Sequence, residues 1–467
     1  MIDLHNVSFS YQDAAGDGIN NVSLQVKQGE CVLLCGRSGC GKSTITRLIN
    51  GLIPHFYTGA LTGGVQVAGL DMARTPLYVI AEKVGSVLQN PRTQFFNADT
   101  DSEIVFGLEN LAYPAAEISR RLAQTTQELR LEKLLGRSIL TLSGGEKQKI
   151  AFASVYALSP AVYVLDEPSS NLDAQAIAEL QALLQLLKQQ GKTLVIAEHR
   201  LYYLRGIADR VIYMEEGRIT GEYTGGEFLQ MSPDERAAKG LRAMQVTAGP
   251  RPAVKSGQGK PVLEIRDWAL AYEKRTIIEN IRITASCGDI IGVTGCNGAG
   301  KSTFCRTLCG LRPEFAGLFY WQGRPVTQQE RLKLTYLVMQ DVHYQLFAES
   351  VAAECKLGNA ADDRRVTAVL QGLSLYEYRQ RHPLSLSGGQ QQRTAVAVST
   401  LCDKEILIFD EPTSGLDFGG MCQVSGLMAE LAAAGKVIFV ISHDQELIVH
   451  TCNRVFCLAD GRVRELL

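Results

Sequence analysis

Short apolar runs alternate with longer amphipathic segments along the chain. The runs VYVLD, TLVIA, EILIF and VIFVIS carry almost no polar residues, which is typical of strands buried on both faces of a parallel sheet. Residues 174–192 instead follow a helical period that ends near Gly191, and their apolar positions share one face: Ile177, Leu180, Leu183, Leu184 and Leu187. Strands that alternate with helices predict an α/β fold with a doubly wound, mainly parallel sheet.

This pattern occurs twice in the chain. GRSGCGKST begins at Gly36 and GCNGAGKST at Gly295, while LSGGE at Leu142 recurs as LSGGQ at Leu386. From the LSGG segments onward the two copies keep a constant offset, so few residues have been inserted or lost there. We therefore expect two homologous domains, residues 1–231 and 262–467. The stretch 232–261 ends in Pro, Gly and small residues and predicts a flexible, partly extended linker.

Both glycine-rich segments predict phosphate-binding loops. In GxxxxGK[ST] between a strand and a helix, glycines let backbone N–H groups face the phosphates, and the following helix directs its positive end toward them. The lysines are expected to reach the β- and γ-phosphates, and the serine hydroxyls to bind Mg²⁺. The expected binding residues are Gly36, Ser38, Gly39, Gly41, Lys42, Ser43 and Thr44, and Gly295, Asn297, Gly298, Gly300, Lys301, Ser302 and Thr303.

Each copy also has two adjacent carboxylates at the end of an apolar strand. Asp166 and Asp410 occupy the position from which a carboxylate holds Mg²⁺ directly or through water. Glu167 and Glu411 follow immediately and can polarise an attacking water. An isolated Asp-Glu pair would more simply be a solvated turn, but beside the repeated glycine loops the pairs predict hydrolysis of a nucleoside triphosphate.

The LSGG segments, each about twenty residues before LDEP or FDEP, resemble the signature of the ATP-binding-cassette (ABC) ATPases. The resemblance covers both halves of the chain. It implies two tandem P-loop NTPase domains, each with a mainly parallel sheet, a helical signature subdomain and a small antiparallel β part. It also implies hydrolysis of ATP, with Mg²⁺ as cofactor, coupled to transport across a membrane.

The resemblance assigns further residues by position. Gln89 and Gln340 match the glutamine that touches Mg²⁺ and the nucleophilic water, and His199 and His443 match a histidine that contacts the γ-phosphate. The loops that end at Asp173 and Asp417 match the segment that crosses between the cassettes. Two aromatic residues match the position that stacks on adenine, although such residues are also common in a core: Tyr11 and Tyr272.

The signature explains the duplication, because in this family it contacts the nucleotide held by the opposite cassette. Two fused cassettes are thus expected to form two composite sites, head to tail, from the loop of one and the signature of the other. Both sites keep every expected polar group, so two competent sites are predicted. The signature residues concerned are Ser143, Gly144 and Gly145, and Ser387, Gly388 and Gly389.

Composition narrows the class of protein further. The 467 residues are 46% hydrophobic and 21% charged with a net charge of −2, which fits a globular protein and argues against an obligatory nucleic-acid partner. No apolar run is long enough for a transmembrane helix, and the N-terminus lacks the features of a signal peptide. The twelve cysteines are expected to be reduced, small apolar residues rather than a metal or disulfide framework.

Two segments of the first copy indicate the kind of transporter. VGSVLQNPRTQFF and the following FGLENL resemble the ATPases of energy-coupling factor (ECF) importers, which take up vitamins and transition-metal ions. The resemblance implies a transmembrane coupling protein and a small substrate-binding membrane protein as partners. It also implies a peripheral position on the cytoplasmic face of the membrane, with one copy of this chain per complex. The second copy has neither segment, so the two cassettes are expected to contact different parts of the partner.

Apolar residues between each glutamine and the signature are candidates for contact with that partner, or else for the core: Phe95, Phe96, Phe106, Tyr344, Leu346 and Phe347. Two alternatives to the ECF interpretation remain. A fused ATPase of a monosaccharide importer would more often have altered second-site motifs. A soluble tandem ABC protein acting on ribosomes would more often have a long charged helical linker. The transported substrate cannot be read from this chain.

Overall fold

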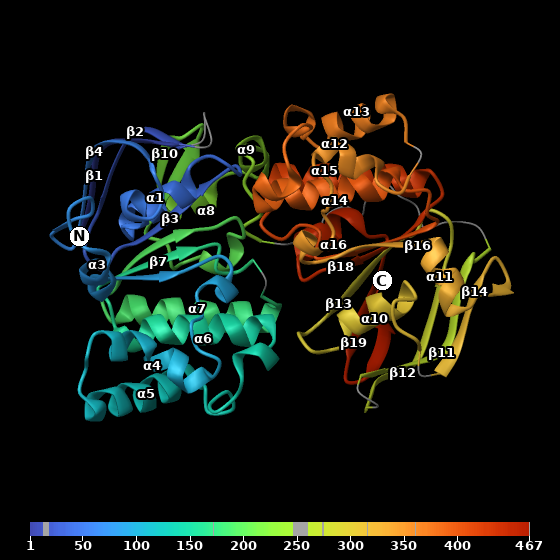
Figure 1. The fold of residues 1–467 in the computed structure, drawn as a ribbon, viewed down its shortest axis with the longest axis horizontal. Helices are drawn as coiled ribbons and strands as arrows, with labels where there is room; N and C mark the ends of the chain where they lie inside the picture. The colour runs from blue at the N-terminus through green and yellow to red at the C-terminus, as the bar shows by residue number, and fades with distance from the viewer. Residues whose placement is uncertain are drawn as a thin grey trace. The chain divides into compact units, whose positions relative to one another are not determined.

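The chain folds into two units, residues Met1–Gln245 and Val246–Leu467. The structure is a computed structural model that describes residues 1–12, 18–170, 172–245, 260–272, 275–314, 316–359 and 361–466. Each unit contains one six-stranded sheet and one four-stranded sheet, so the expected pair of α/β domains with a small antiparallel part is confirmed (Figure 1).

The six-stranded sheet of the first unit has the order β10-β9-β3-β8-β7-β6, and only β10 is antiparallel to its neighbour. Its strands are Cys31–Gly36 (β3), Val84–Val87 (β6), Val162–Asp166 (β7), Thr193–Ala197 (β8), Arg210–Glu215 (β9) and Arg218–Thr224 (β10). The antiparallel sheet has the order β2-β1-β4-β5. It contains Ile2–Tyr11 (β1), Gly18–Val26 (β2), Gly59–Val67 (β4) and Leu70–Asp71 (β5).

Alternate residues of β3 enter different cores, as expected for a strand covered on both faces. Val32 and Leu34 pack with α1 and the antiparallel sheet, whereas Cys31 and Leu33 pack with α6, α7 and α8. Helices α4, α5 and α6 pack against one another as a helical group (Figure 1). The helices are Lys42–Ile49 (α1), Leu52–His55 (α2), Leu77–Lys83 (α3), Thr100–Asn110 (α4), Ala115–Leu129 (α5), Gly144–Leu158 (α6), Ala174–Gln189 (α7), Gly225–Gln230 (α8) and Pro233–Ala238 (α9).

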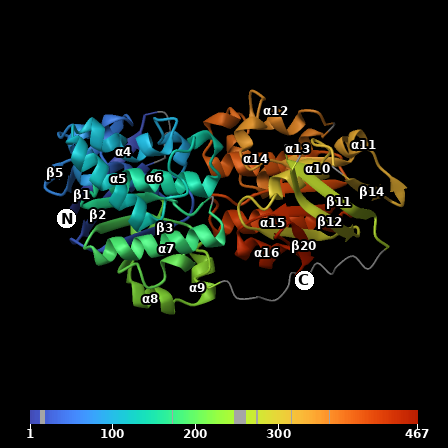
Figure 2. The same ribbon diagram turned by 90° about the horizontal axis from the view of Figure 1, so that it is seen from below.

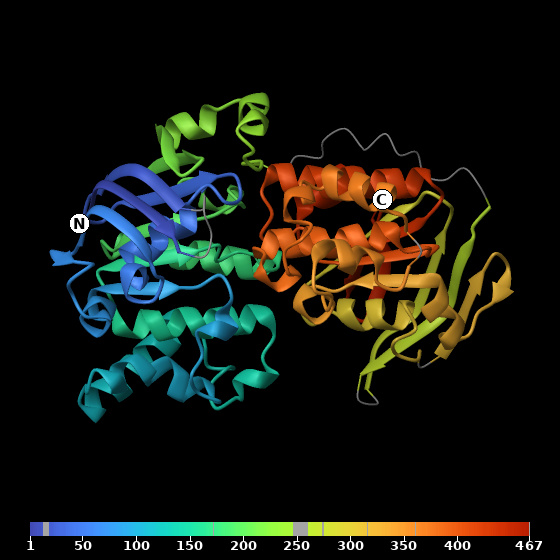
Figure 3. The same ribbon diagram turned by 45° about the horizontal axis from the view of Figure 1, so that its top comes forward.

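The second unit repeats this plan, with a sheet of order β16-β17-β18-β13-β19-β20 and an antiparallel sheet of order β12-β11-β14-β15. Figure 3 shows its two longest strands, β11 and β12, side by side. The strands are Leu263–Tyr272 (β11), Arg275–Ala285 (β12), Ile290–Gly295 (β13), Ala316–Trp321 (β14), Arg324–Pro325 (β15), Thr335–Val338 (β16), Ile406–Asp410 (β17), Val437–Ile441 (β18), Arg454–Ala459 (β19) and Arg462–Glu465 (β20). The helices are Lys301–Leu308 (α10), Gln328–Leu334 (α11), Val351–Lys356 (α12), Asp363–Gly372 (α13), Gly388–Leu401 (α14), Phe418–Ala433 (α15) and Gln445–Thr451 (α16).

The first unit extends further along the chain than its predicted end at residue 231. Helix α9 covers Pro233–Ala238, close to α8 in Figure 2, and Leu241 and Met244 are buried in the core beside α7. The first part of the predicted linker 232–261 therefore folds onto the first unit, and residues 246–259 lie outside the described part. In the parts of the chain that the structure describes, no helix has the length and apolar character needed to cross a membrane.

Candidate ATP site in each unit

The glycine loop of the first unit joins β3 to α1. Gly36, Gly39 and Gly41 have φ values of 142°, 80° and 100°, and a Cβ on Gly36 would lie 2.2 Å from the carbonyl oxygen of Met214. Gly41 is the N-cap of α1 and supplies no side-chain cap, so the first N–H groups of the helix are arranged to bind an anion. The buried Lys42 ammonium donates to the carbonyls of Gly36 (3.0 Å) and Arg37 (3.1 Å) and so lies across the loop.

The loop of the second unit has the same geometry between β13 and α10. Gly295, Gly298 and Gly300 have φ values of 148°, 80° and 96°. Lys301 donates to the carbonyls of Gly295 (2.8 Å) and Cys296 (2.9 Å). Both predicted phosphate loops therefore have the strand–loop–helix context that this chemistry requires. The remaining predicted loop residues lie in the same segments: Ser38, Ser43 and Thr44, and Asn297, Ser302 and Thr303.

The expected Mg²⁺ ligands come together in the first unit. Asp166 ends β7, and the Ser43 hydroxyl donates to its Oδ1 at 3.2 Å. Burial raises the pKa of Asp166, against the opposing effects of Ser43, Arg47 and Lys42. A hydroxyl and a carboxylate this close supply the hard oxygen ligands that Mg²⁺ prefers, so the residues fit the ion. In the second unit burial raises the pKa of Asp410 to about 6, opposed by Lys301 and Arg306.

Glu167 lies at the centre of the first site in a left-handed backbone conformation, with φ of 46°. Its Oε2 accepts from Gln89 Nε2 at 2.8 Å, and its Oε1 lies 3.5 Å from Nε2 of His199. The side chain is only 12% exposed. Burial, with the neighbouring Asp166 carboxylate as the second cause, raises the pKa of Glu167 to about 8. The structure thus brings together the glutamine, carboxylates and histidine that the sequence predicted as one site.

Glu411 occupies the same position in the second unit, with φ of 51°. Its carboxylate accepts from the Ser442 hydroxyl at 2.9 Å and from the backbone N–H of His443 at 3.0 Å. The imidazole Nε2 of His443 lies 3.0 Å from Asn297 Oδ1 and 3.7 Å from Glu411 Oε1. The histidine therefore links the glycine loop to the carboxylate. Gln340 follows β16 as Gln89 follows β6.

The surroundings of His199 include residues that the sequence analysis did not select. Burial, together with the positive charge of Lys42, holds the pKa of His199 well below its usual range. The buried Glu198 carboxylate accepts from the backbone N–H groups of His199 (2.7 Å) and Arg200 (3.0 Å) and from the Tyr203 hydroxyl (2.7 Å). The only available signal was a charged residue directly after the apolar run TLVIA.

Both signature serines begin helices. Ser143 is the N-cap of α6 and forms a capping box with Glu146, and Ser387 caps α14 in the same way with Gln390. Consequently, the glycines that follow lie in the first helical turn, where backbone N–H groups face outward. These glycines are Gly144 and Gly145, and Gly388 and Gly389.

Of the two predicted adenine-stacking tyrosines, the structure describes the side chain of Tyr11. The Tyr11 hydroxyl lies 3.2 Å from Thr44 Oγ1 and accepts from Arg47 at 2.8 Å, which places the ring beside the first turn of α1. The Arg47 guanidinium also lies over the ring of Tyr57, 4.2 Å from its centroid, and this second aromatic residue was not anticipated. The side chain of Tyr272 lies outside the described part of the chain.

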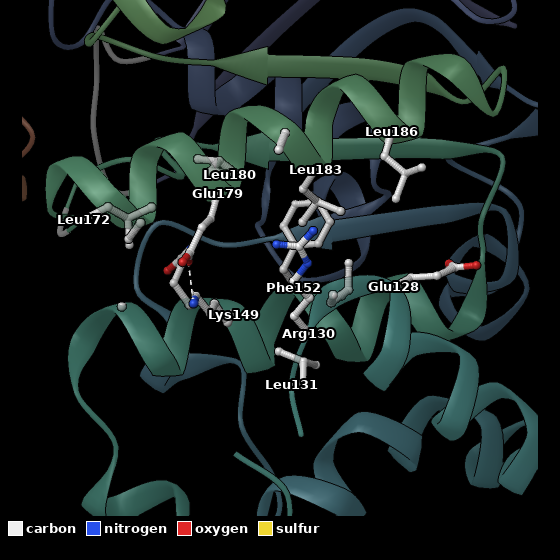
Figure 4. A pocket seen from close by; sticks show the side chains of 15 residues that line it. Glu128, Arg130, Leu131, Lys149, Phe152, Leu172, Glu179, Leu180, Leu183 and Leu186 are labelled. Carbon is white, nitrogen blue, oxygen red and sulfur yellow. Dashed lines mark ion pairs between the residues drawn. The ribbon is translucent and has the colours of Figure 1, made fainter. Parts of the chain in front are cut away.

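A cavity of about 320 Å³ in the first unit lies away from the glycine loop, between α6 and α7 (Figure 4). Its walls are largely apolar, with an ion pair between Lys149 and Glu179 at one end. Gly145 and Leu172 contribute to the lining, so the cavity borders the signature helix rather than the phosphate loop.

Comparison with known proteins places this geometry in a family. The ABC transporter family profile matches residues 19–170 and 278–414. A protein of Treponema denticola assigned as an ABC transporter ATP-binding protein is 47% identical over 470 residues, 99% of this chain and 96% of the relative. One of Enterococcus faecalis with the same assignment is 31% identical, over 99% of this chain and 90% of its own length.

The chain is thus an ABC-type ATPase with two cassettes fused in one polypeptide. It belongs to the ABC transporter family of ATP-binding proteins, whose members are ATPases that use ATP with Mg²⁺, so the predicted activity and cofactors are confirmed. A solved structure titled "Model of ribosome-bound archaeal Pelota and ABCE1" aligns with a TM-score of 0.72 over 98% of this chain and 78% of that chain. At 20% identity, this likeness shows a shared fold alone.

Proposed function

We propose that this chain is the ATPase of an ECF-type importer for a vitamin or a transition-metal ion. The observation that carries the proposal is a pair of exposed aromatic loops, one after each glutamine. Phe96, in the first cassette, is 77% exposed and stacks on Phe106 with ring centroids 5.0 Å apart. Phe347 in the second cassette is 73% exposed. Large aromatic side chains exposed in this way are typical of protein interfaces.

Buried carboxylates fix both aromatic loops in place. Glu103 of α4 accepts from the N–H groups of Phe96 (3.0 Å) and Asn97 (2.8 Å). Glu354 of α12 accepts from the N–H groups of Phe347 and Ala348, both at 2.7 Å. Because a buried charge is costly unless it is well hydrogen-bonded, these contacts favour a loop built to hold its aromatic residue outward.

The candidate partner residues divide into two groups. Tyr344 is exposed like Phe96 and Phe347, and Phe106 is half-buried. Leu346, by contrast, is buried in the core of the second unit, and the half-buried Phe95 packs against the helical group of the first. We assign the exposed residues to a membrane coupling protein, which would in turn carry a small substrate-binding membrane protein. The ATPase would then lie at the cytoplasmic face of the membrane, with one chain per complex.

Within this function, each site residue keeps its predicted role. Glu167 and Glu411 polarise the attacking water, and His199 and His443 contact the γ-phosphate. Mg²⁺ would be held by Ser43, Gln89 and Asp166, and by Ser302, Gln340 and Asp410. By the family resemblance, the signature of each cassette would complete the ATP site of the other. The exposed Gly144 and Gly388, at the starts of α6 and α14, support that assignment.

An affinity pull-down from detergent-solubilised membranes, followed by mass spectrometry, tests the proposal. Recovery of one multi-span coupling protein together with a small integral membrane protein would support it. Recovery of ribosomal components alone would overturn it. The variant Phe96→Ala with Phe347→Ala should lose the membrane partner. A matched control, Phe56→Ala, removes an aromatic residue that is 70% exposed elsewhere in the first cassette and should retain the partner.

A further inference from the structure

The two cassettes differ in chemistry beside the histidine at the end of their matching strands. The first cassette reads Glu198-His199-Arg200 after β8, whereas the second reads Ser442-His443-Asp444 after β18. Five of these six residues are buried and His443 is half-buried. Both positions that flank the histidine change charge between the copies. The equivalent glutamates Glu167 and Glu411 therefore lie in two different environments within one chain.

In the second cassette the histidine segment binds the catalytic glutamate directly. Glu411 Oε2 accepts from the Ser442 hydroxyl at 2.9 Å, and Oε1 accepts from the His443 N–H at 3.0 Å. The Ser442 hydroxyl oxygen in turn accepts from the Asp444 N–H at 3.0 Å, which orients its proton toward the carboxylate. Both oxygens of Glu411 are therefore engaged by its own cassette before any water arrives.

In the first cassette the equivalent N–H is bound elsewhere. The His199 N–H donates to Glu198 Oε1 at 2.7 Å, so Glu198 accepts the hydrogen bond that the catalytic glutamate accepts in the second cassette. The Glu167 carboxylate accepts a hydrogen bond from Gln89 Nε2 at 2.8 Å. In the family arrangement, that glutamine lies beside the nucleophilic water.

Arg200 and Glu198 both bind the backbone of Ser169, in the segment that follows the carboxylates. The Ser169 N–H donates to Glu198 Oε2 at 3.3 Å, and the Ser169 carbonyl accepts from Arg200 at 3.1 Å. In the second cassette, the matching Thr413 hydroxyl donates to Asp444 Oδ2 at 2.9 Å. Glu198 is therefore fixed from several sides and does not depend on Glu167 for a partner.

We propose that Glu198 is a positioning residue that frees Glu167 for catalysis, whereas Ser442 holds Glu411 back, so that the two ATP sites are unequal. The inference rests on the proposed catalytic roles of the two glutamates. In the first site Glu198 already accepts the hydrogen bond of the His199 N–H. In the second site the Glu411 carboxylate must first give up hydrogen bonds to Ser442 and His443, and that step raises the barrier to hydrolysis.

The first test is Ser442→Ala in the full chain with its membrane complex. Loss of one hydrogen bond to a charged group should raise kcat by at least about twofold, with KM unchanged, because ground-state restraint is removed without altering ATP contacts. Ser399→Ala is the matched control, since it removes another buried serine hydroxyl of the second cassette, one that donates to a carbonyl within α14. An unchanged or lower kcat for Ser442→Ala would overturn the proposal.

The second test concerns the first cassette and uses two variants, so that it remains informative if one of them folds poorly. Glu198→Ser should let the His199 N–H turn to Glu167 and lower kcat by about threefold or more, again with KM unchanged. Glu198→Gln keeps an acceptor for that N–H and should restore most of the activity, even if Glu198→Ser is poorly folded. If Glu198→Gln and Glu198→Ser both matched the wild type, Glu198 would not be a positioning residue.

Trapping with vanadate and a radiolabelled azido-ATP shows which cassette turns over. Peptide mapping should find most label in the first cassette of the wild type, and a shift toward the second cassette in Ser442→Ala. Equal labelling in both proteins would contradict the inequality. Hydrolysis that persists in the double variant Glu167→Gln with Glu411→Gln would instead remove the catalytic assignment itself, so the two failures are distinguishable.

Discussion

Glu167→Gln should stabilise the nucleotide-free protein while it abolishes turnover at the first site. The pKa of Glu167 rises from 4.5 to about 8 because the carboxyl is buried beside Asp166. Between these two pH values the folded chain holds a proton that the unfolded chain has released. Stability is therefore lost progressively as pH rises through this window, and above the folded pKa the full penalty applies. A glutamine has the same shape and does not titrate.

The magnitude follows from the width of that window. Each pH unit between the two pKa values corresponds to about 1.4 kcal/mol, so at pH 7 the wild type bears a cost of about 3 kcal/mol. The neighbouring contacts can remain, because a glutamine oxygen can still accept from Gln89. For a unit of this size, such a gain corresponds to a rise in the unfolding midpoint on the order of 5–10 °C.

Scanning calorimetry in EDTA, without nucleotide, would measure the effect. The transition of the first unit should shift upward in Glu167→Gln at pH 7 and pH 8, and should change little at pH 5. Glu109→Gln, at an exposed position of α4, provides a control that should stay within about 0.5 kcal/mol of the wild type. A destabilised Glu167→Gln, or a gain that did not depend on pH, would refute the electrostatic reasoning.

Two further predictions concern backbone features of the sites. Gly36→Ala should abolish ATP binding and lower the unfolding free energy by about 2 kcal/mol or more, because its Cβ would lie 2.2 Å from the Met214 carbonyl oxygen. Nucleotide titration would measure the binding and calorimetry the stability. Unaltered binding would contradict the loop geometry. Ser387→Ala should cost about 1 kcal/mol by loss of the α14 cap, measured by denaturant unfolding, whereas Ser385→Ala at the preceding turn should cost less.

Much of each site could be predicted because its chemistry depends on contiguous residues. A phosphate loop needs glycines, a lysine and a helix start within nine positions, and Lys42 and Lys301 lie where that spacing predicts. The signature serines were likewise predictable, since an N-cap has a local sequence pattern. The two adjacent carboxylates at the end of an apolar strand in each copy could also be predicted from neighbouring residues alone.

The remaining features depend on contacts between distant parts of the sequence. Glu198 acts on Ser169 and Tyr203, and no local pattern shows that a carboxylate after TLVIA will be buried and fully hydrogen-bonded. Similarly, Leu241 and Met244 resemble linker residues until the fold places them against α7. The sequence could indicate that Leu346 was apolar, but not which side of the loop would face the core.

The shared backbone of the two sites shows why their side chains can differ. Glu167 and Glu411 both adopt a left-handed backbone conformation, which is costly for a residue with a Cβ. In each cassette the N–H of this glutamate donates to a carbonyl of the neighbouring strand at 2.8 Å. The acceptor is Ala197 in the first cassette and Ile441 in the second. The backbone alone therefore fixes where each carboxylate begins. What the flanking residues decide is where its oxygens point. The difference between Glu198 and Ser442 can thus change how strongly the catalytic carboxylate of one site is restrained, without disturbing the fold that both sites share.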